Sequence, residues 1–240
     1  VYGEGEDERV LRAVQVVIDE RLARPILIGR PAVIAARIAR AGLRFRPGVD
    51  VEVVDPESDA RYRDYWNDYQ RLMGRHGVTP DMAKALLRRS TTTIGAMMVR
   101  RGDADALLCG LVGRFDVHLG HVRDVIGLKP GATTFATLNA LMLPQQTIFV
   151  TDTFVNEEPT AEELAEIAAM AAVEVRRFGL PPKVAFLSHS MFGSSDRPSA
   201  RRMRRAHKLF AAACPDVECD GEMHGDAALS EEVRRTFLPD

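Results

Sequence analysis

Residues 25–54 have the sequence PILIGRPAVIAARIARAGLRFRPGVDVEVV and set the architecture of the chain. The apolar runs at 25–29 and 51–54 predict two short buried strands. Between them, residues 32–41 carry apolar side chains at helical spacing, and Gly42 is a typical residue just beyond a helix end. A strand, a helix and a second strand in this order favour a parallel sheet with a right-handed crossover.

The alternation of strands and helices extends in both directions from this unit. Before it, Val1 and Tyr2 have the character of a strand end, and residues 6–22 form an amphipathic helical pattern. After it, the pattern predicts helices at 61–73, 81–87 and 93–101 and a strand at 106–109. This order places helices on both faces of a parallel sheet, so an α/β fold is expected.

The pattern changes after Ile126, where Lys129-Pro130-Gly131 interrupts the chain. Residues 133–143 and 147–150 predict two strands joined as a hairpin by Pro144-Gln145-Gln146. A second α/β unit follows, with helices predicted at 161–178, 199–213 and 227–235 and strands at 183–187 and 217–219. We therefore expect two subdomains, residues 1–126 and residues 127–240.

Composition excludes several classes of protein. With 240 residues, 46% hydrophobic and 28% charged, the chain has the composition of a soluble globular protein. A net charge of -2 gives no general attraction to nucleic acid or anionic membranes, and the apolar runs are too short to span a bilayer, so neither partner is expected. No basic and apolar leader precedes the first helix, which favours a cytoplasmic location. Three cysteines without a CxxC pair and histidines without ligand spacing predict neither disulfides nor a metal site.

The richest candidate site is the loop 188–196, SHSMFGSSD, between the apolar run 184–187 and the basic run RRMRR at 201–205. A loop from a buried strand to a helix exposes backbone N–H groups, and serine hydroxyls add donors that suit a phosphate. Gly193 permits close approach of the backbone. The alternative is a plain helix cap, in which Ser195 or Asp196 opens the helix at Pro198.

Ligands of open α/β sheets bind outside the carboxyl ends of the strands. The loops expected there are 4–7, 110–114, 151–156, 188–196 and 220–226. Asn156 is either a turn former or a ligand contact, and Thr160 with Glu163 fits a helix capping box. Glu222 and Asp226 are candidates for a general acid and base; the alternatives are that Asp226 caps the last helix or that both bind a metal with His224. The GxGxxG, Walker A, GxSxG and HExxH motifs do not occur.

Several of these stretches together resemble the phosphate acetyltransferase (phosphotransacetylase) family, in family order over nearly the whole chain. They are Glu4-Gly5-Glu6-Asp7-Glu8-Arg9-Val10-Leu11, Gly95-Ala96-Met97-Met98-Val99 with Gly102-Asp103-Ala104-Asp105, Asn156-Glu157-Glu158-Pro159-Thr160-Ala161-Glu162, residues 188–195, and Asp220-Gly221-Glu222 with Asp226-Ala227-Ala228-Leu229. Residues 188–196, 220–224 and 121–128 look like the phosphotransacetylase-like C-terminal domain of the large bacterial malic enzymes.

The resemblance implies two α/β/α subdomains of the isocitrate/isopropylmalate dehydrogenase-like type with a cleft between them. It also implies a homodimer or larger assembly, with acetyl-CoA or another CoA ester as a regulatory ligand and no cofactor in this chain itself. An N-terminal malic enzyme domain would bind NADP and a divalent metal and would oxidatively decarboxylate malate to pyruvate. The ligand contacts implied are Ser188, Ser190, Gly193, Ser194, Ser195, Arg197, Asn156, Gly110, Arg114, Glu222 and Asp226.

The sequence departs from the family at a position that matters for catalysis. Active members carry an arginine that grips phosphate, and a gapless match places Gly120 there, with Arg114 and Arg123 as possible substitutes. Loss of a charge-assisted contact of this kind removes about 2 kcal/mol or more in a desolvated site. The family's catalytic Asn-Asp-Leu-Ser-Arg segment is not found in the chain, which suggests a fragment of a longer polypeptide.

These features predict a regulatory domain without catalytic residues of its own, which senses acetyl-CoA for an NADP-dependent malic enzyme. The alternatives are an active phosphate acetyltransferase that moves acetyl between CoA and phosphate, and a structural module that serves only in assembly.

Overall fold

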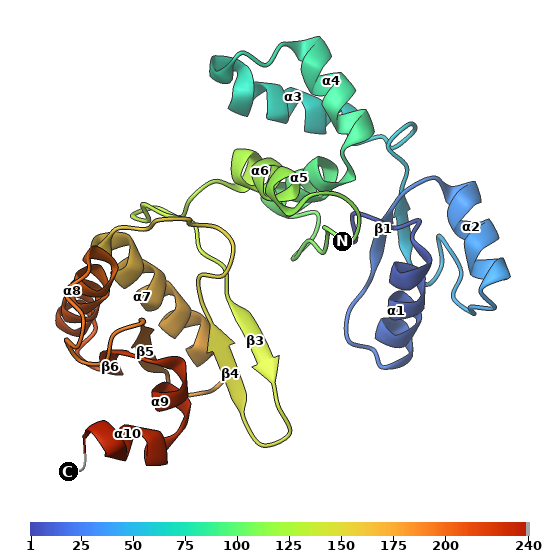
Figure 1. Cartoon of the computed structure of the whole chain (residues 1–240). Coiled ribbons are helices and arrows are strands. Elements are labelled where there is room, and N and C mark those ends of the chain that lie inside the picture. Colours follow the sequence, from blue (N-terminus) through green and yellow to red (C-terminus); the bar gives the residue numbers. More distant parts are fainter. Residues whose placement is uncertain (239–240) are drawn as a thin grey trace. The chain divides into compact units, whose positions relative to one another are not determined.

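The computed structural model describes residues 1–238, which form two compact units, one from Val1 to Gly127 and one from Leu128 on (Figure 1). Both units combine parallel strands with helices, which confirms the predicted α/β class. None of the helices within residues 1–238 has the length and apolar character needed to cross a bilayer.

The first unit is built on a small parallel sheet. Strands β1 (Ile26–Ile28) and β2 (Glu52–Val54) pair in parallel, with Ile26 opposite Glu52. Tyr2 forms parallel bridges to both Leu27 and Leu108, so it lies between them. The helices of this unit are α1 (Glu8–Asp19), α2 (Pro31–Arg40), α3 (Tyr62–Met73), α4 (Pro80–Arg89), α5 (Thr91–Arg101) and α6 (Phe115–Ile126), with a short 3₁₀ turn η1 (Gly74–His76).

Alternate residues of the strands face two separate hydrophobic cores. Leu27 and Val51 pack with Leu11, Val14 and other apolar residues of α1 and α2. On the opposite face, Ile28 and Val54 pack with α3, α4 and α5, where Tyr65 and Tyr69 of α3 are buried. These two tyrosines, four residues apart, therefore belong to the face of α3 that packs into the core.

The predicted strand at 106–109 is reduced to the single bridge at Leu108. Leu108 donates its N–H to the Val1 carbonyl at 2.8 Å, and its own carbonyl accepts from the Gly3 N–H at 2.9 Å. The Ala106 carbonyl also accepts from the Val1 amino group at 2.6 Å, so the run bonds to residues 1–3 through Ala106 and Leu108 without forming a full strand. The prediction of the other strands of this sheet is confirmed within a residue or two.

The second unit contains a hairpin and a parallel pair of strands. Strands β3 (Asn139–Met142) and β4 (Thr147–Val150) are antiparallel, as predicted, and β5 (Lys183–Leu187) pairs in parallel with β6 (Glu218–Met223). The helices are α7 (Ala161–Arg177), α8 (Pro198–Ala213), α9 (Gly225–Leu229) and α10 (Glu231–Phe237). The predicted capping box of α7 is confirmed, since the side chains and backbone N–H groups of Thr160 and Glu163 bond reciprocally at 2.7 and 3.2 Å.

Three predicted elements of this unit differ from those observed. Residues 133–138 are not a strand, because their polar groups bond to side chains, including Thr133 to Glu166. Strand β6 continues to Met223, beyond the predicted end at Cys219. The predicted helix 227–235 is divided at Ser230, whose hydroxyl accepts from the Val233 N–H at 3.3 Å and so starts α10.

Gly5 is required by the close approach of the first loop to β1. A Cβ at this position would lie 2.7 Å from the Ile28 carbonyl oxygen and 2.8 Å from the Ile28 nitrogen. We expect Gly5→Ala to lower the free energy of unfolding by about 2 kcal/mol, because backbone atoms must move. Urea unfolding measures this loss.

Gly120→Ala is the matched control, since Gly120 lies within α6 and a Cβ there meets no atom within 4 Å. This variant should gain up to about 1 kcal/mol from higher helix propensity. Equal stability of the two variants would contradict the packing described for Gly5.

Candidate functional site

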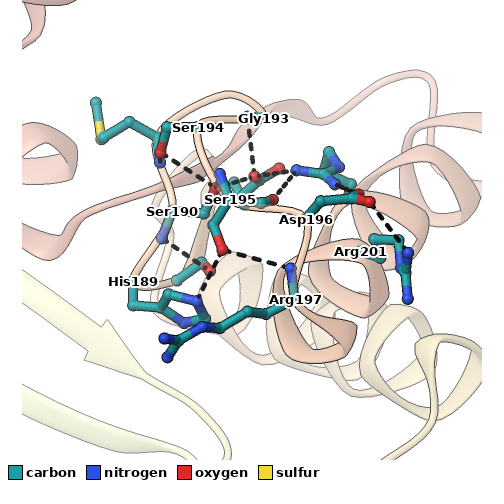
Figure 2. Close-up of polar contacts among 12 residues, drawn as sticks. His189, Ser190, Gly193, Ser194, Ser195, Asp196, Arg197 and Arg201 are labelled. Atoms are coloured by element: carbon teal, nitrogen blue, oxygen red, sulfur yellow. Dashed lines mark hydrogen bonds and ion pairs between the residues drawn. The ribbon is translucent and has the colours of Figure 1, made fainter.

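The serine loop, residues 188–197, connects the carboxyl end of β5 to the first turn of α8 (Figure 2). It is tied to β6, because the Ser188 N–H donates to the Met223 carbonyl and the Phe192 N–H donates to the Glu222 carbonyl, both at 2.8 Å. Gly193 has φ +94°, in the left-handed region that favours glycine. The loop therefore has a defined conformation set by the neighbouring strand.

Glu222 lies on β6 beneath this loop, and its side chain has no exposed surface. Its Oε1 accepts hydrogen bonds from the Ser190 hydroxyl at 2.7 Å, the Arg204 guanidinium at 2.8 Å and the Gly193 N–H at 3.0 Å. Burial raises the pKa of Glu222, but the hydrogen bonds from Ser190, Gly193 and Arg204 outweigh it and hold the pKa below its ordinary value. The Glu222 carboxylate is thus ionised and holds the serine loop through hydrogen bonds from the interior.

The serines of the loop divide into two groups. Ser190 is fully buried, the Ser188 hydroxyl accepts from the Ser190 N–H at 3.2 Å, and the Ser194 hydroxyl accepts from the Met191 N–H at 2.9 Å, so these three serve the loop itself. The Ser195 hydroxyl instead lies 3.4 Å from Nε2 of the exposed His189. Figure 2 shows the side chain of Arg197 beside His189. We call the set Ser195, His189 and Arg197 the outer face of the loop.

The amino end of α8 has no side-chain cap. The N-cap residue is Arg197, with Pro198 in the first turn, so the proposed alternative in which Ser195 or Asp196 caps the helix is wrong. Asp196 instead forms ion pairs with Arg201 at 3.1 Å and Arg204 at 3.2 Å. The first N–H groups of α8 therefore remain a partial positive charge next to the outer face.

Asn156 has its polar side-chain atoms engaged within the second unit. Its Nδ2 donates to the Phe135 carbonyl and to Asp152 Oδ2, both at 2.7 Å, and its Oδ1 accepts from the Thr134 hydroxyl at 3.2 Å. Asp152 also accepts from the Thr137 N–H at 3.0 Å. This network joins the segments before β3 and after β4, so the observed contacts of Asn156 hold these two segments of the second unit together.

Glu222 and Asp226, the candidates for a general acid and base, lie on different elements: Glu222 belongs to β6 and Asp226 to the first turn of α9. Asp226 Oδ1 accepts from the Ala227 N–H at 2.8 Å, whereas the N-cap residue of α9 is His224, so the predicted capping role of Asp226 is wrong. Within residues 1–238 no group of three or more His, Cys, Asp or Glu side chains is arranged to hold a metal. The alternative metal site at Glu222, His224 and Asp226 is therefore not formed.

The first unit has a cleft of about 470 Å³ at the carboxyl ends of its strands. The cleft lies beside Tyr2, which is bridged to Leu27 on one side and to Leu108 on the other. The strand order of the sheet reverses at this point, and ligands of such sheets usually bind there. Charged side chains that the sequence did not single out contribute to the lining, namely Glu57, Arg30, Arg37 and Arg88.

The loop 110–114 is fixed to this unit by Glu4. Glu4 Oε1 accepts from the Gly110 N–H at 2.8 Å and the Leu111 N–H at 3.1 Å. Arg114 is the N-cap residue of α6 and forms an exposed ion pair with Asp116 at 2.6 Å. The candidate residues of the first unit, Gly110 and Arg114, are thus held by acidic partners of the chain itself.

Comparison with known proteins gives the family of this fold. The family model "Phosphate acetyl/butaryl transferase" matches residues 1–240. The chain is similar to a phosphotransacetylase structure from Streptococcus pyogenes, with a TM-score of 0.86 and 28% identity, covering 100% of this chain and 72% of that one. The chain therefore belongs to the phosphate acetyl/butaryl transferase family, which confirms the resemblance inferred from its motifs.

Malic enzymes are the more similar relatives in sequence. The NAD-dependent malic enzyme of Rhizobium meliloti (strain 1021) and the NADP-dependent malic enzyme of Escherichia coli (strain K12) are both 52% identical over 240 residues, all of this chain. A phosphate acetyltransferase of Nitratidesulfovibrio vulgaris is 30% identical over 239 residues, 33% of its own length. The chain spans 31% and 32% of the length of the two malic enzymes.

The Glu6–Arg30 ion pair in the cleft of the first unit should make the stability of the fold depend on pH. Hydrogen bonds from the Arg30 guanidinium lower the pKa of Glu6 below its ordinary value of 4.5, and burial only partly opposes them. A carboxyl group whose pKa is lowered in the folded state stabilises the fold at pH values above its ordinary pKa. This stabilisation is lost as the pH falls through the lowered pKa. Glu6→Gln should therefore destabilise the chain at neutral pH, and its difference from wild type should shrink below pH 4.5.

Urea unfolding between pH 3 and pH 7 checks this expectation, in the range where carboxylates titrate. Glu20→Gln, at the exposed end of α1, is the control and should show no such convergence with wild type. A Glu6→Gln difference that stays constant across the range would contradict the role of the Glu6–Arg30 pair.

Proposed function

We propose that this chain is a regulatory domain that binds acetyl-CoA, without catalytic residues of its own, in a malic enzyme. The observation that carries the proposal is the outer face of the serine loop. It brings the Ser195 hydroxyl, the His189 ring and the Arg197 side chain next to the uncapped amino end of α8. Hydrogen-bond donors and positive charge of this kind suit the phosphate groups of CoA.

The charge balance of the loop supports an anionic ligand. The buried carboxylate of Glu222 is paired with Arg204, and Asp196 is paired with Arg201 and Arg204. Ion pairing of both carboxylates reduces their repulsion of a phosphate. Arg197, in contrast, forms no ion pair in the described part of the chain, so its guanidinium is free to meet a ligand.

Position 120 supports a binding role rather than a catalytic one. The resemblance to active phosphotransacetylases puts a phosphate-gripping arginine there, and this chain has Gly120 in the middle of α6, with open space around it. Of the two substitutes considered, Arg114 has its guanidinium paired with Asp116 at 2.6 Å, and Arg123 is exposed in the last turn of α6. A domain that binds CoA esters but cannot hold phosphate, the second substrate, would sense acetyl-CoA without transferring its acetyl group.

In this proposal the oxidative decarboxylation of malate takes place outside the 240 residues, with NADP or NAD and a divalent metal bound there. Acetyl-CoA would act by binding two arrangements of the protein with different affinity, since only such a difference shifts an equilibrium. Self-association as a homodimer or larger assembly and a cytoplasmic location belong to the same proposal.

An active phosphate acetyltransferase is the second candidate, favoured by the 30% identity to the enzyme of Nitratidesulfovibrio vulgaris. Its chemistry requires a base for the CoA thiol and cations that hold phosphate in place. We expect no phosphate-dependent consumption of acetyl-CoA by the purified protein. Steady turnover above the rate without protein would establish the second candidate in place of the first.

Calorimetric titration of acetyl-CoA tests the binding proposal directly. We expect saturable binding at micromolar concentration, weakened about tenfold in Arg197→Gln, because a charged hydrogen bond contributes about 1.5–3 kcal/mol. Arg177→Gln removes the same charge from the same unit at the exposed end of α7 and should bind as wild type does. Absence of binding to wild type, or an equal loss in both variants, would contradict the proposal.

A further inference from the structure

Glu222 is linked to both backbone polar groups of Ser195, although it does not touch that residue. The Ser195 N–H donates to the Ser190 hydroxyl oxygen at 3.0 Å, and the Ser195 carbonyl accepts from the Arg204 guanidinium at 2.9 Å. Ser190 and Arg204 each donate in turn to Glu222 Oε1. The peptide groups on both sides of Ser195 are therefore oriented through one buried oxygen atom.

We propose that Glu222 is a positioning residue for the outer face of the serine loop: it fixes Ser195 through Ser190 and Arg204 and does not contact the ligand. The inference rests on the proposed binding of acetyl-CoA at this loop. It replaces the direct ligand contact that the resemblance implies for Glu222, because a side chain with no exposed surface cannot reach a phosphate.

The arrangement of the carboxylate favours a positioning role. Its bonds to Ser190, Gly193 and Arg204 all meet at Oε1, whereas Oε2 is buried without a hydrogen-bond partner in the described part of the chain. The donors come from the start of the loop, its glycine turn and helix α8. A single ionised oxygen that joins these segments holds them in one geometry, and a buried charge paired in this way resists rearrangement.

Loss of the charge should loosen the loop at specific points. In Glu222→Gln the amide oxygen can still accept, but Arg204 loses its buried ionic partner and the amide NH₂ replaces an oxygen in a buried position. The amide protons of Gly193 and Ser195 should then exchange with solvent faster. Amides in the middle of α7, such as that of Ala168 in the core, should be unaffected if the change is local.

The experiment compares wild type, Glu222→Gln and Glu218→Gln by acetyl-CoA calorimetry and by residue-resolved amide hydrogen exchange. Glu218 lies on the same strand but is 72% exposed, so its variant is a matched control. We expect Glu222→Gln to bind about tenfold more weakly and to exchange about tenfold faster at Gly193 and Ser195, with Ala168 unchanged. Glu218→Gln should match wild type in both measurements.

Unchanged exchange at Gly193 and Ser195 in Glu222→Gln overturns the proposal, as does unchanged affinity. Equal acceleration at Ala168 also overturns it, because the effect is then general destabilisation. If wild type binds no acetyl-CoA, the proposed function fails, and the exchange pattern alone decides whether Glu222 orders the loop. Should Glu222→Gln fail to fold, Ser190→Ala removes one of the two links between Glu222 and Ser195. Exchange should then be faster at Ser195, while Gly193, which still donates to Glu222, and Ala168 stay as in wild type.

Discussion

The contact between a carboxylate at the carboxyl edge of a parallel sheet and the loop that follows a neighbouring strand organises both units. In the second unit, Glu222 on β6 binds the Gly193 N–H of the loop that follows β5. In the first unit, Glu4 follows Tyr2 and binds the Gly110 and Leu111 N–H groups, just after Leu108, which is bridged to Tyr2. Each carboxylate satisfies backbone donors at the carboxyl edge of a parallel sheet, where unpaired N–H groups would otherwise be left.

The fold follows from sequence patterns that depend on near neighbours. Apolar runs, helical spacing and the Thr160–Glu163 capping box predicted β1, β2, α2 and α7 within a residue or two, because the interactions that form them are local. The hairpin of β3 and β4 was predicted in the same way from Pro144-Gln145-Gln146. Its first strand was predicted too long, since residues 133–138 bond to distant side chains rather than to a strand.

The contacts of the serine loop could not be predicted from the sequence, because they join residues that are far apart in the chain. Asp220-Gly221-Glu222 has the polar and glycine content of a loop, yet β6 continues through it. Position 221 requires glycine, because a Cβ there would lie 2.7 Å from the Phe186 carbonyl oxygen of the neighbouring strand. Likewise, nothing in SHSMFGSSD separates Ser190, which bonds Glu222 in the interior, from Ser195 on the outer face. That division depends on a partner far along the chain.

The central claim is that acetyl-CoA binds at the outer face of the serine loop. The most direct measurement is a titration of the isotope-labelled protein with acetyl-CoA, followed through the backbone amide resonances. We expect saturable shifts that are largest at His189, Ser195 and Arg197, the residues that form this face. Shifts confined to the cleft residues of the first unit, such as Gly5 and Gly29, or no shifts at millimolar ligand, would contradict it.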